Sequence, residues 1–298
     1  MYYICIDIGG TSTKYAILNK NGELFVNGMI PTRVTKNKNY ILTDIKKLVK
    51  DLLEQYKMYE IKGICISSAG VVDPDKGEII FSGPTIPEYK GTRIKQEIEK
   101  TFDILCEVEN DVNCAALGEY WQGAGKNSES MVCLTLGTGI GGAVILNGKL
   151  LNGIGYTAGE IGYMEVNGEH IQNIASAKTL VKLIQEKKEK EGIKGKITGF
   201  NIFELAKQGD EICIDAISTI IKNLSVGIRN IIYLLNPQVI VIGGGIAEQK
   251  EYMEEKIREE VNKGLVGDIF KKTEIRLAEK GNQAGILGAL YNFINKHS

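Results

Sequence analysis

The spacing of apolar residues in the first part of the chain predicts several strands around one helix. Short apolar, β-rich runs lie at residues 2–8, 15–18, 23–29 and 61–67. The tetrapeptide Asn19-Lys20-Asn21-Gly22, between two of these runs, is typical of a turn. Residues 40–58 instead carry apolar side chains at helical spacing. The pattern therefore predicts an antiparallel opening followed by a β-α-β unit.

A similar order of elements follows in the second part of the chain. The predicted strands lie at residues 104–109, 131–136, 143–146 and 238–242, and the predicted helices at 112–121, 177–190, 212–235, 248–262 and 284–293. We expect two α/β lobes, residues 1–110 and 111–283, with an apolar-striped C-terminal helix, residues 284–298, that can return to the first lobe. The polar stretch at residues 191–196 is predicted to be a surface loop.

The composition is that of a globular protein with a small-molecule ligand. The chain has 298 residues, 43% apolar and 24% charged, and a single core usually stops growing at about this length. The formal net charge of −1 gives no electrostatic reason to bind nucleic acid or an anionic membrane. No apolar run approaches the roughly 20 residues that span a bilayer, and the first residues lead into a strand rather than a signal peptide. We therefore expect a cytoplasmic protein.

The cysteines predict neither a disulfide framework nor a zinc site. They stand singly in apolar segments, without C-x-x-C or C-x-C spacing. Buried, reduced thiols are the simplest interpretation, because free cysteine is among the most buried residue types. The six residues are Cys5, Cys65, Cys106, Cys114, Cys133 and Cys213.

The segment Asp7-Ile8-Gly9-Gly10-Thr11 is the strongest local signal for a nucleotide site. It follows the first strand and turns directly into the second. Gly9 and Gly10 would let backbone amides approach phosphate oxygens, and Thr11 adds a hydroxyl donor. Asp7 can hold Mg²⁺ through water or through phosphate. A plain β-turn with an acidic neighbour is the alternative interpretation.

A second glycine turn, Gly137-Thr138-Gly139-Ile140-Gly141-Gly142, matches the G-x-G-x-x-G pattern of dinucleotide sites. The match is misleading, because a strand follows at residues 143–146 and the dinucleotide fingerprint must open a helix. A hairpin that clamps phosphate fits better, with the backbone of Gly137, Gly139 and Gly142 and the hydroxyl of Thr138 as its donors. The chain has no G-x-x-x-x-G-K-[ST] loop, so a P-loop enzyme is excluded.

Two further glycine segments could pack against adenosine. Gly243-Gly244-Gly245 ends a buried-type strand, where ligands commonly bind in α/β sheets, and Gly281-Asn282-Gln283-Ala284-Gly285 could line the same crevice. We expect nucleotide contacts from Gly244 and Gly245. Each segment could equally be a plain strand-to-helix turn.

Asn110-Asp111-Val112-Asn113 stands between a predicted strand and a predicted helix. Asp111 could be a general base, since phosphoryl transfer to a hydroxyl needs a proton acceptor placed in line with the γ-phosphate. It could equally be a helix N-cap, because aspartate is strongly preferred there. The residues alone leave both interpretations open.

Taken together, these motifs resemble the ROK family of sugar kinases and repressors over essentially the whole chain. The resemblance rests on Asp7-Ile8-Gly9-Gly10-Thr11, Glu109-Asn110-Asp111-Val112-Asn113-Cys114-Ala115-Ala116, Gly137-Thr138-Gly139-Ile140-Gly141-Gly142, Gly159-Glu160-Ile161-Gly162 and Gly243-Gly244-Gly245. It implies an actin-like, hexokinase-like ATPase fold of two ribonuclease H-like α/β lobes, with ATP and the sugar in a cleft. By the same resemblance, a homodimer is expected.

The resemblance also implies roles for individual residues. Asp111 is similar to the catalytic base, and Asn110 and Glu160 to ligands of the sugar hydroxyls. Gly70 lies in a segment, residues 67–73, that resembles the loop on the sugar side. Thr85 stands where the family usually has an asparagine, and is expected to contact the substrate in its place.

Two departures from the family pattern concern zinc and the sugar. Tyr163 replaces the histidine of Gly-Glu-x-Gly-His, and the cysteine-rich zinc segment is missing, so no zinc site is expected. Tyr163 can hydrogen-bond to substrate. Gln172 stands where a sugar-binding glutamate is usual. His170 is predicted to be a surface or packing residue, and His297 an incidental one.

The resemblance implies ATP-dependent phosphorylation, with Mg²⁺, of the primary 6-hydroxyl of a hexose or β-glucoside. An N-acetylmannosamine kinase or a plain glucokinase is the alternative. A repressor would need a helix-turn-helix ahead of the phosphate loop, and only six residues precede Asp7. A non-catalytic sugar sensor is disfavoured by the retained Asp7, Asp111 and Thr138.

Overall fold

The computed structural model describes residues 1–192, 197–245 and 249–297, which pack into two compact units. The first unit comprises Met1–Gln122, Asn152–Thr157 and the chain from Asn282 onward. The second comprises the described residues of Gly123–Leu151 and Ala158–Gly281. Residues 111–122, which were expected in the second lobe, thus pack with the first unit. The lobe boundaries themselves stay a prediction.

The first unit is built on a mixed sheet with the strand order β3-β2-β1-β4-β7. Its strands are β1 (Tyr2–Ile8), β2 (Ser12–Asn19), β3 (Leu24–Pro31), β4 (Ile61–Ser68) and β7 (Cys106–Asn110). The first three strands pair antiparallel, whereas β4 is parallel to both β1 and β7. The predicted antiparallel opening is therefore confirmed. A small hairpin of β5 (Val71–Asp73) and β6 (Glu78–Phe81), which the apolar pattern did not predict, follows β4.

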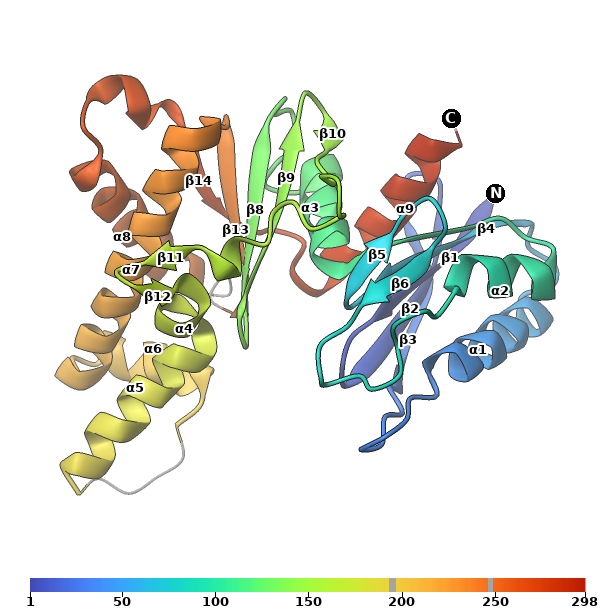
Figure 1. Ribbon diagram of the computed structural model, residues 1–298, viewed down its shortest axis with the longest axis horizontal. Helices are drawn as coiled ribbons and strands as arrows, with labels where there is room; N and C mark the ends of the chain where they lie inside the picture. The colour runs from blue at the N-terminus through green and yellow to red at the C-terminus, as the bar shows by residue number, and fades with distance from the viewer. Residues whose placement is uncertain (193–196, 246–248, 298) are drawn as a thin grey trace. The chain divides into compact units, whose positions relative to one another are not determined.

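Helices cover both faces of this sheet (Figure 1). Helices α1 (Ile41–Gln55) and α2 (Ile94–Phe102) pack on the face formed by Ile4, Ile6 and Ile8. Helices α3 (Asp111–Gln122) and α9 (Ala284–Lys296) pack on the opposite face, around Cys5 and Cys65. The alternation of side chains along β1 thus separates two cores.

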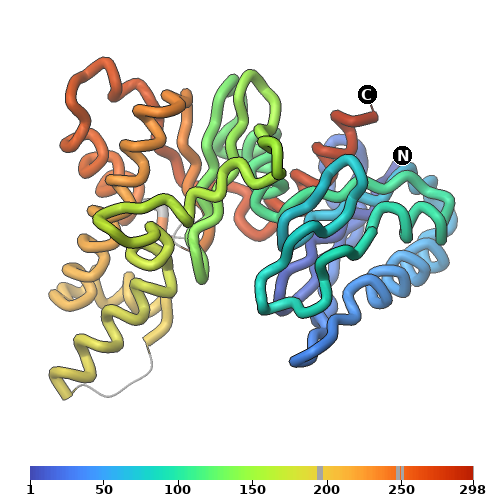
Figure 2. The backbone as a smooth tube through the Cα atoms, viewed as in Figure 1, coloured from blue at the N-terminus to red at the C-terminus, as the bar shows by residue number. Residues whose placement is uncertain are grey.

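Glycines let α3 and α9 approach each other closely, and the two helices run side by side (Figure 2). A Cβ at Gly288 would lie 1.7 Å from the carbonyl oxygen of Cys114, and one at Gly118 would lie 2.2 Å from that of Ala284. Neither position has room for a side chain. The C-terminal helix is therefore part of the first unit and packs against α3, the helix that begins at the candidate base Asp111.

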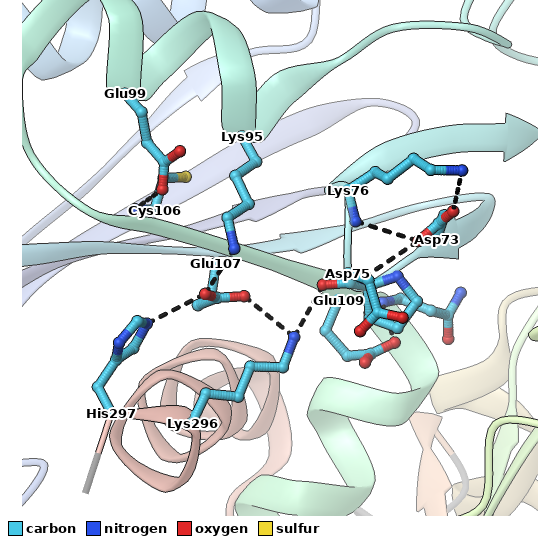
Figure 3. Close-up of polar contacts among 12 residues, drawn as sticks. Asp73, Asp75, Lys76, Lys95, Glu99, Cys106, Glu107, Glu109, Lys296 and His297 are labelled. Atoms are coloured by element: carbon cyan, nitrogen blue, oxygen red, sulfur yellow. Dashed lines mark hydrogen bonds and ion pairs between the residues drawn. The ribbon is translucent and has the colours of Figure 1, made fainter.

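A buried carboxylate on β7 fastens the end of α9 to the sheet (Figure 3). Glu107 accepts hydrogen bonds from Lys95 at 2.7 Å and Lys296 at 3.0 Å, and its Oε1 lies 3.0 Å from His297 Nε2. Burial alone would raise the pKa of Glu107, but the hydrogen bonds and charges of the two lysines hold it below its usual value. His297, expected to be incidental to function, therefore takes part in this structural cluster.

The second unit is built on a sheet with the strand order β10-β9-β8-β13-β14. Its strands are β8 (Met131–Leu136), β9 (Ile140–Leu146), β10 (Lys149–Leu150), β13 (Val239–Gly244) and β14 (Glu274–Leu277). Its helices are α4 (Ile171–Ala175), α5 (Ala177–Lys190), α6 (Gly199–Lys207), α7 (Glu211–Leu235) and α8 (Lys250–Gly264). Residues 193–196 of the predicted surface loop, and residue 248 at the predicted start of α8, lie outside the described residues.

Helix α7 forms much of the second core, with buried residues from Cys213 to Ile232 along one face. Among the residues that the structure describes, no helix is long and apolar enough to cross a membrane. None of the six cysteines forms a disulfide and all are buried, which confirms the interpretation of the cysteines as reduced core residues.

Candidate active site

The carboxyl ends of three parallel strands bring the candidate acidic residues of the first unit to one edge of its sheet. Asp7 in β1 pairs in register with Ser67 in β4, and Ser67 with Glu109 in β7. Asn110 is the last residue of β7, and Asp111 begins α3. This edge is where ligands commonly bind in α/β sheets.

Asn110 caps helix α3 and also holds Asp111. Its Oδ1 accepts hydrogen bonds from the backbone N–H groups of Val112 at 2.9 Å and Asn113 at 3.0 Å. Its Nδ2 donates to Asp111 Oδ1 at 3.0 Å and to the carbonyl oxygen of Gly70 at 2.9 Å. Asp111 Oδ1 also accepts from Val112 N at 3.0 Å. Most of the capping that Asp111 was expected to provide, in the non-catalytic interpretation, is therefore supplied by Asn110.

The surroundings of Asp111 suit a general base. Enclosure by protein atoms, and then the negative charge of Asp7, raise the pKa of Asp111 to about 6, against the opposing effect of the hydrogen bonds from Val112 and Asn110. The side chain keeps some solvent exposure. A carboxylate with a pKa near 6 is ionised at neutral pH and still accepts a proton readily.

Asp7 is held in place beside an open glycine turn. Ser67 Oγ donates a hydrogen bond to Asp7 Oδ1 at 2.6 Å, and a Cβ at Gly285 would lie 3.1 Å from the Asp7 carboxyl group. Gly9 N donates to Ser12 O at 3.0 Å and closes the turn. A Cβ at Gly10 would meet no atom within 4 Å, and Thr11 is exposed, so this turn is free to receive a ligand.

Gly70 and Thr85 differ in how firmly the structure holds them. Gly70 has a φ of +97°, and a Cβ there would lie 2.7 Å from the carbonyl oxygen of Phe81, so the turn after β4 requires glycine. Thr85 is exposed in the loop between β6 and α2. Its predicted contact with substrate stays a prediction.

The second unit holds the other glycine hairpin, between β8 and β9. Gly137 N donates to Gly139 O at 2.9 Å, and Gly137 O accepts from Lys178 N, in the first turn of α5, at 3.2 Å. Thr138 is exposed at the tip. Gly244 lies opposite Leu136 in the register of β13 and β8, with a φ of +88° and its Cβ position 2.2 Å from Leu136 O. The structure thus places Gly244 beside the hairpin, and Gly245 follows it, exposed.

Gly142 and Gly159 join this hairpin to the segment that contains Glu160. A Cβ at Gly142 would lie 2.4 Å from Gly159 O, and Gly159 has a φ of +89°. Gly142 was predicted to bind nucleotide. Packing against Gly159 accounts at least in part for the glycine at this position. Burial raises the pKa of Glu160, which lies directly after Gly159.

The carboxamide of Gln172 lies between the two predicted binding segments of the second unit. Its Oε1 lies 2.7 Å from the position of a Cβ on Gly139 and 3.2 Å from that on Gly162. Two glycines thus make room for one side chain. Gln172 therefore lies close to both the glycine hairpin of residues 137–142 and the segment of Glu160. Its predicted contact with the sugar stays a prediction.

Tyr163 and His170, at the ends of the segment where the family has zinc, contact each other. Their ring centroids are 5.7 Å apart in an edge-to-face arrangement, and Tyr163 is 58% exposed. In the described ranges, no group of three or more His, Cys, Asp or Glu side chains is placed to hold a metal ion.

We predict that protein purified without a metal-affinity tag contains far less than one zinc ion per chain. The reason is that a tyrosine hydroxyl is a poor zinc ligand and the cysteine cluster is missing. Elemental analysis of the purified protein measures the ratio directly. A stoichiometric zinc signal that survives dialysis would contradict the prediction.

The motifs did not reveal two groups that support the site. Ser67 holds Asp7, and Tyr89 lies buried against Ser68 at the end of β4. In the sequence, two adjacent serines at the end of an otherwise apolar strand could have indicated that polar side chains are needed there. No sequence pattern distinguishes Tyr89, which lies in the middle of a loop.

The described part of the chain forms two α/β units, and each is built on a five-stranded sheet with a glycine hairpin near its first strand. This arrangement is a two-lobed fold of the hexokinase type. The model of the ROK family matches residues 3–296, so the chain belongs to the ROK family. The resemblance and the fold class predicted from the motifs are thereby confirmed.

Similar proteins and solved structures cover nearly the whole chain. A β-glucoside kinase of Listeria innocua is 31% identical over 305 residues, which cover 100% of this chain and 99% of that protein. An uncharacterized protein of Clostridium perfringens is 47% identical over 98% of this chain and 97% of its own length. The crystal structure of a ROK family glucokinase from Streptomyces griseus, in complex with glucose and AMPPNP, aligns with a TM-score of 0.82, 26% identity and coverage of 97% and 98%.

Proposed function

We propose that this protein transfers the γ-phosphate of ATP to the primary 6-hydroxyl of a hexose or a β-glucoside. The proposal rests on Asp111. Its carboxylate lies at the junction of β7 and α3, and its pKa is raised to about 6. Kinase chemistry at a hydroxyl needs such a proton acceptor. Similarity to a glucokinase and to a β-glucoside kinase supports the same reaction class.

Each group of candidate residues has a distinct part in this reaction. Asp111 accepts the proton as the sugar hydroxyl attacks the γ-phosphate, and Asn110 keeps its carboxylate oriented. We expect Gly70, Thr85, Asn110, Glu160, Tyr163 and Gln172 to line the sugar site. We expect phosphate and adenosine contacts from Gly9, Gly10, Thr11, Gly137, Thr138, Gly139, Gly142, Gly244 and Gly245, because backbone amides at glycine turns suit anionic oxygens.

Asp7 is the residue that we expect to hold Mg²⁺, through water or through the phosphates. Its carboxylate lies close enough to Asp111 to raise the pKa of that residue, and oxygen donors of this kind suit a hard cation. A bound Mg²⁺ neutralises charge on the phosphates of ATP. ATP, Mg²⁺ and one sugar are the proposed small-molecule partners, and a homodimer stays the predicted assembly.

A coupled assay of ADP release across sugars and disaccharides tests the proposal. The panel should include glucose, N-acetylmannosamine and cellobiose, because the alternatives are a plain glucokinase and an N-acetylmannosamine kinase. At least one sugar should stimulate ADP release well above the sugar-free rate. A protein that binds sugars without consuming ATP would instead be a sensor, and the proposed reaction would be wrong.

The dependence of kcat/KM on pH should follow the titration of Asp111. Its pKa in the folded protein is about 6, so the base is increasingly protonated below that pH. We expect kcat/KM for the sugar to fall by about tenfold per pH unit below this value, since kcat/KM reports the free enzyme's ionisations. A profile that is flat down to pH values near the ordinary aspartate pKa of about 3.9 would contradict the assignment.

A further inference from the structure

A pair of hydroxyl groups is buried at the end of β4, beside the strand that leads to the candidate base. Tyr89 OH lies 2.8 Å from Ser68 Oγ, and both residues are 0% exposed. Tyr89 comes from the loop between β6 and α2, and Ser68 is the last residue of β4. The tyrosine ring packs in the core of the first unit with residues such as Ile8 and Ile66. A buried phenol normally needs a hydrogen-bond partner, and this one is provided by Ser68.

One arrangement of protons lets both hydroxyl groups donate. Ser68 has one hydroxyl proton, and its Oγ lies 3.1 Å from the carbonyl oxygen of Ala69 in a geometry that lets it donate. Either hydroxyl can be the donor in the Tyr89–Ser68 bond, and when Ser68 donates to Ala69, Tyr89 donates to Ser68. That arrangement connects Tyr89 through Ser68 to the backbone of Ala69, at the start of the turn at residues 69–70.

The same turn is connected to Asp111 through Asn110. Ser68 pairs in register with Asn110 on β7, and Asn110 Nδ2 is shared between Gly70 O and Asp111 Oδ1. The carboxylate and the turn therefore depend on one amide group. Burial, and then the negative charge of Asp111, raise the pKa of Tyr89 against the effect of Ser68, which is consistent with a short path between phenol and carboxylate.

Two hydrogen bonds hold the loop that carries Tyr89 at the residues just before it. Asn39 Nδ2 donates to the carbonyl oxygen of Pro87 at 2.8 Å, and Ser82 Oγ donates to that of Ile86 at 3.3 Å. Ile86 is 3% exposed. A residue on a loop held in this way can serve as a fixed support for its partner.

We propose that the Tyr89–Ser68 hydroxyl pair positions the Asp111 carboxylate for proton transfer, by holding the turn at Ala69 and Gly70 against Asn110. Tyr89 and Ser68 act through other residues and are positioning residues. The proposal rests on the proposed kinase function. Without the phenol, Ser68 and the turn at residues 69–70 can shift. The carbonyl oxygen of Gly70 then no longer fixes the side-chain amide of Asn110. The Asp111 carboxylate, which this amide holds, adopts orientations that do not face the sugar hydroxyl.

The test compares Tyr89→Phe, Ser68→Ala and the double variant with Tyr56→Phe as a matched control. Tyr56 lies in an aromatic group with Phe25 and Tyr59, in the same unit but at the other end of the sheet. We expect Tyr89→Phe to lower kcat per folded enzyme by about fivefold, the rate equivalent of one hydrogen bond, with the KM for ATP changed less than about twofold. The double variant should lose no more than the larger single variant, because the two hydroxyls act as one unit.

A purely structural role would give a different result. Tyr89→Phe would then lower the free energy of unfolding but leave kcat per folded enzyme at the level of Tyr56→Phe, and that outcome overturns the proposal. Additive losses in the double variant would also overturn it. Folded fractions are measured by chemical denaturation at the assay temperature.

Amide hydrogen exchange tests the positioning separately from the reaction. Peptides that cover residues 68–71 and 109–113 should exchange faster in Tyr89→Phe than in the wild type, with peptides of α7 unchanged. If no sugar supports ADP release by the wild type, the proposed function fails while this measurement still decides whether the pair holds the turn. Unchanged exchange in both segments would overturn the positioning role.

Discussion

Asp111→Asn is expected to lower kcat by about 10² to 10⁴, with sugar affinity largely retained. The carboxamide is nearly the same size as the carboxylate and can still receive the hydrogen bonds that reach Oδ1 from Asn110 and Val112. It has no useful basicity. The loss should therefore fall on the chemical step, and not on the KM for ATP. Steady-state kinetics of the variant, with binding of the sugar measured by calorimetry, give both quantities.

The stability of the same variant separates the two interpretations of Asp111. The pKa of the carboxyl group is about 6 in the folded protein, and an unfolded chain has a value of about 3.9. The folded state then binds the proton more tightly, so stability falls as the pH rises from about 4 to about 6, and the loss is complete above about pH 6. Asp111→Asn should stabilise the protein at pH 7, by something on the order of 3 kcal/mol.

A helix cap would behave differently. Asparagine caps a helix about as well as aspartate, so a capping role predicts nearly unchanged stability for Asp111→Asn and an unchanged specific activity of its folded fraction. Asp51→Asn, at an exposed position of α1, is the matched control for the change from aspartate to asparagine. An Asp111→Asn variant with the stability and the kcat of the wild type would assign Asp111 to capping alone.

The sheet framework could be predicted because its signals are local. The alternation in β1, the turn at Asn19 to Gly22 and the helical spacing of Ile41, Ile45 and Leu48 all depend on neighbours in sequence. The glycine hairpins could be predicted for the same reason. Conversely, the hairpin of β5 and β6 is too short to produce a periodic pattern, and was missed.

The supports of the site depend on contacts far apart in sequence, and no periodic pattern reports those. Tyr89 and Ser68 meet across 21 residues, and His297 meets Glu107 across 190. Gly288 was an ordinary glycine in an apolar helix until the structure placed it against Cys114. The motifs predict which residues bind ligand, whereas the packing shows which residues hold those residues in place.

The last prediction concerns the sugar and begins from Gln172. A glutamate at this position could only accept a hydrogen bond, for example from a free anomeric hydroxyl, whereas the carboxamide can also donate one to a glycosidic oxygen. Gln172 is packed beside Gly139 and Gly162, directly after the segment that lacks the family's zinc ligands. We therefore expect cellobiose to be phosphorylated, on its non-reducing glucose, at least as efficiently as free glucose.

The discriminating quantity is the ratio of kcat/KM for cellobiose to that for glucose, because it reports differential binding of the two transition states. Gln172→Glu should shift the ratio toward glucose by about tenfold, the equivalent of one exchanged hydrogen bond of about 1.4 kcal/mol. The new charge also lies close to Gly139 in the phosphate hairpin and could weaken ATP binding, but both sugars share the same ATP, so that effect cancels in the ratio. Gln208→Glu, at an exposed helix end, is the matched control and should leave the ratio unchanged. If the wild type turns over glucose or N-acetylmannosamine well and ignores every glycoside, Gln172 does not select the substrate in this way, and only the broader kinase proposal stands.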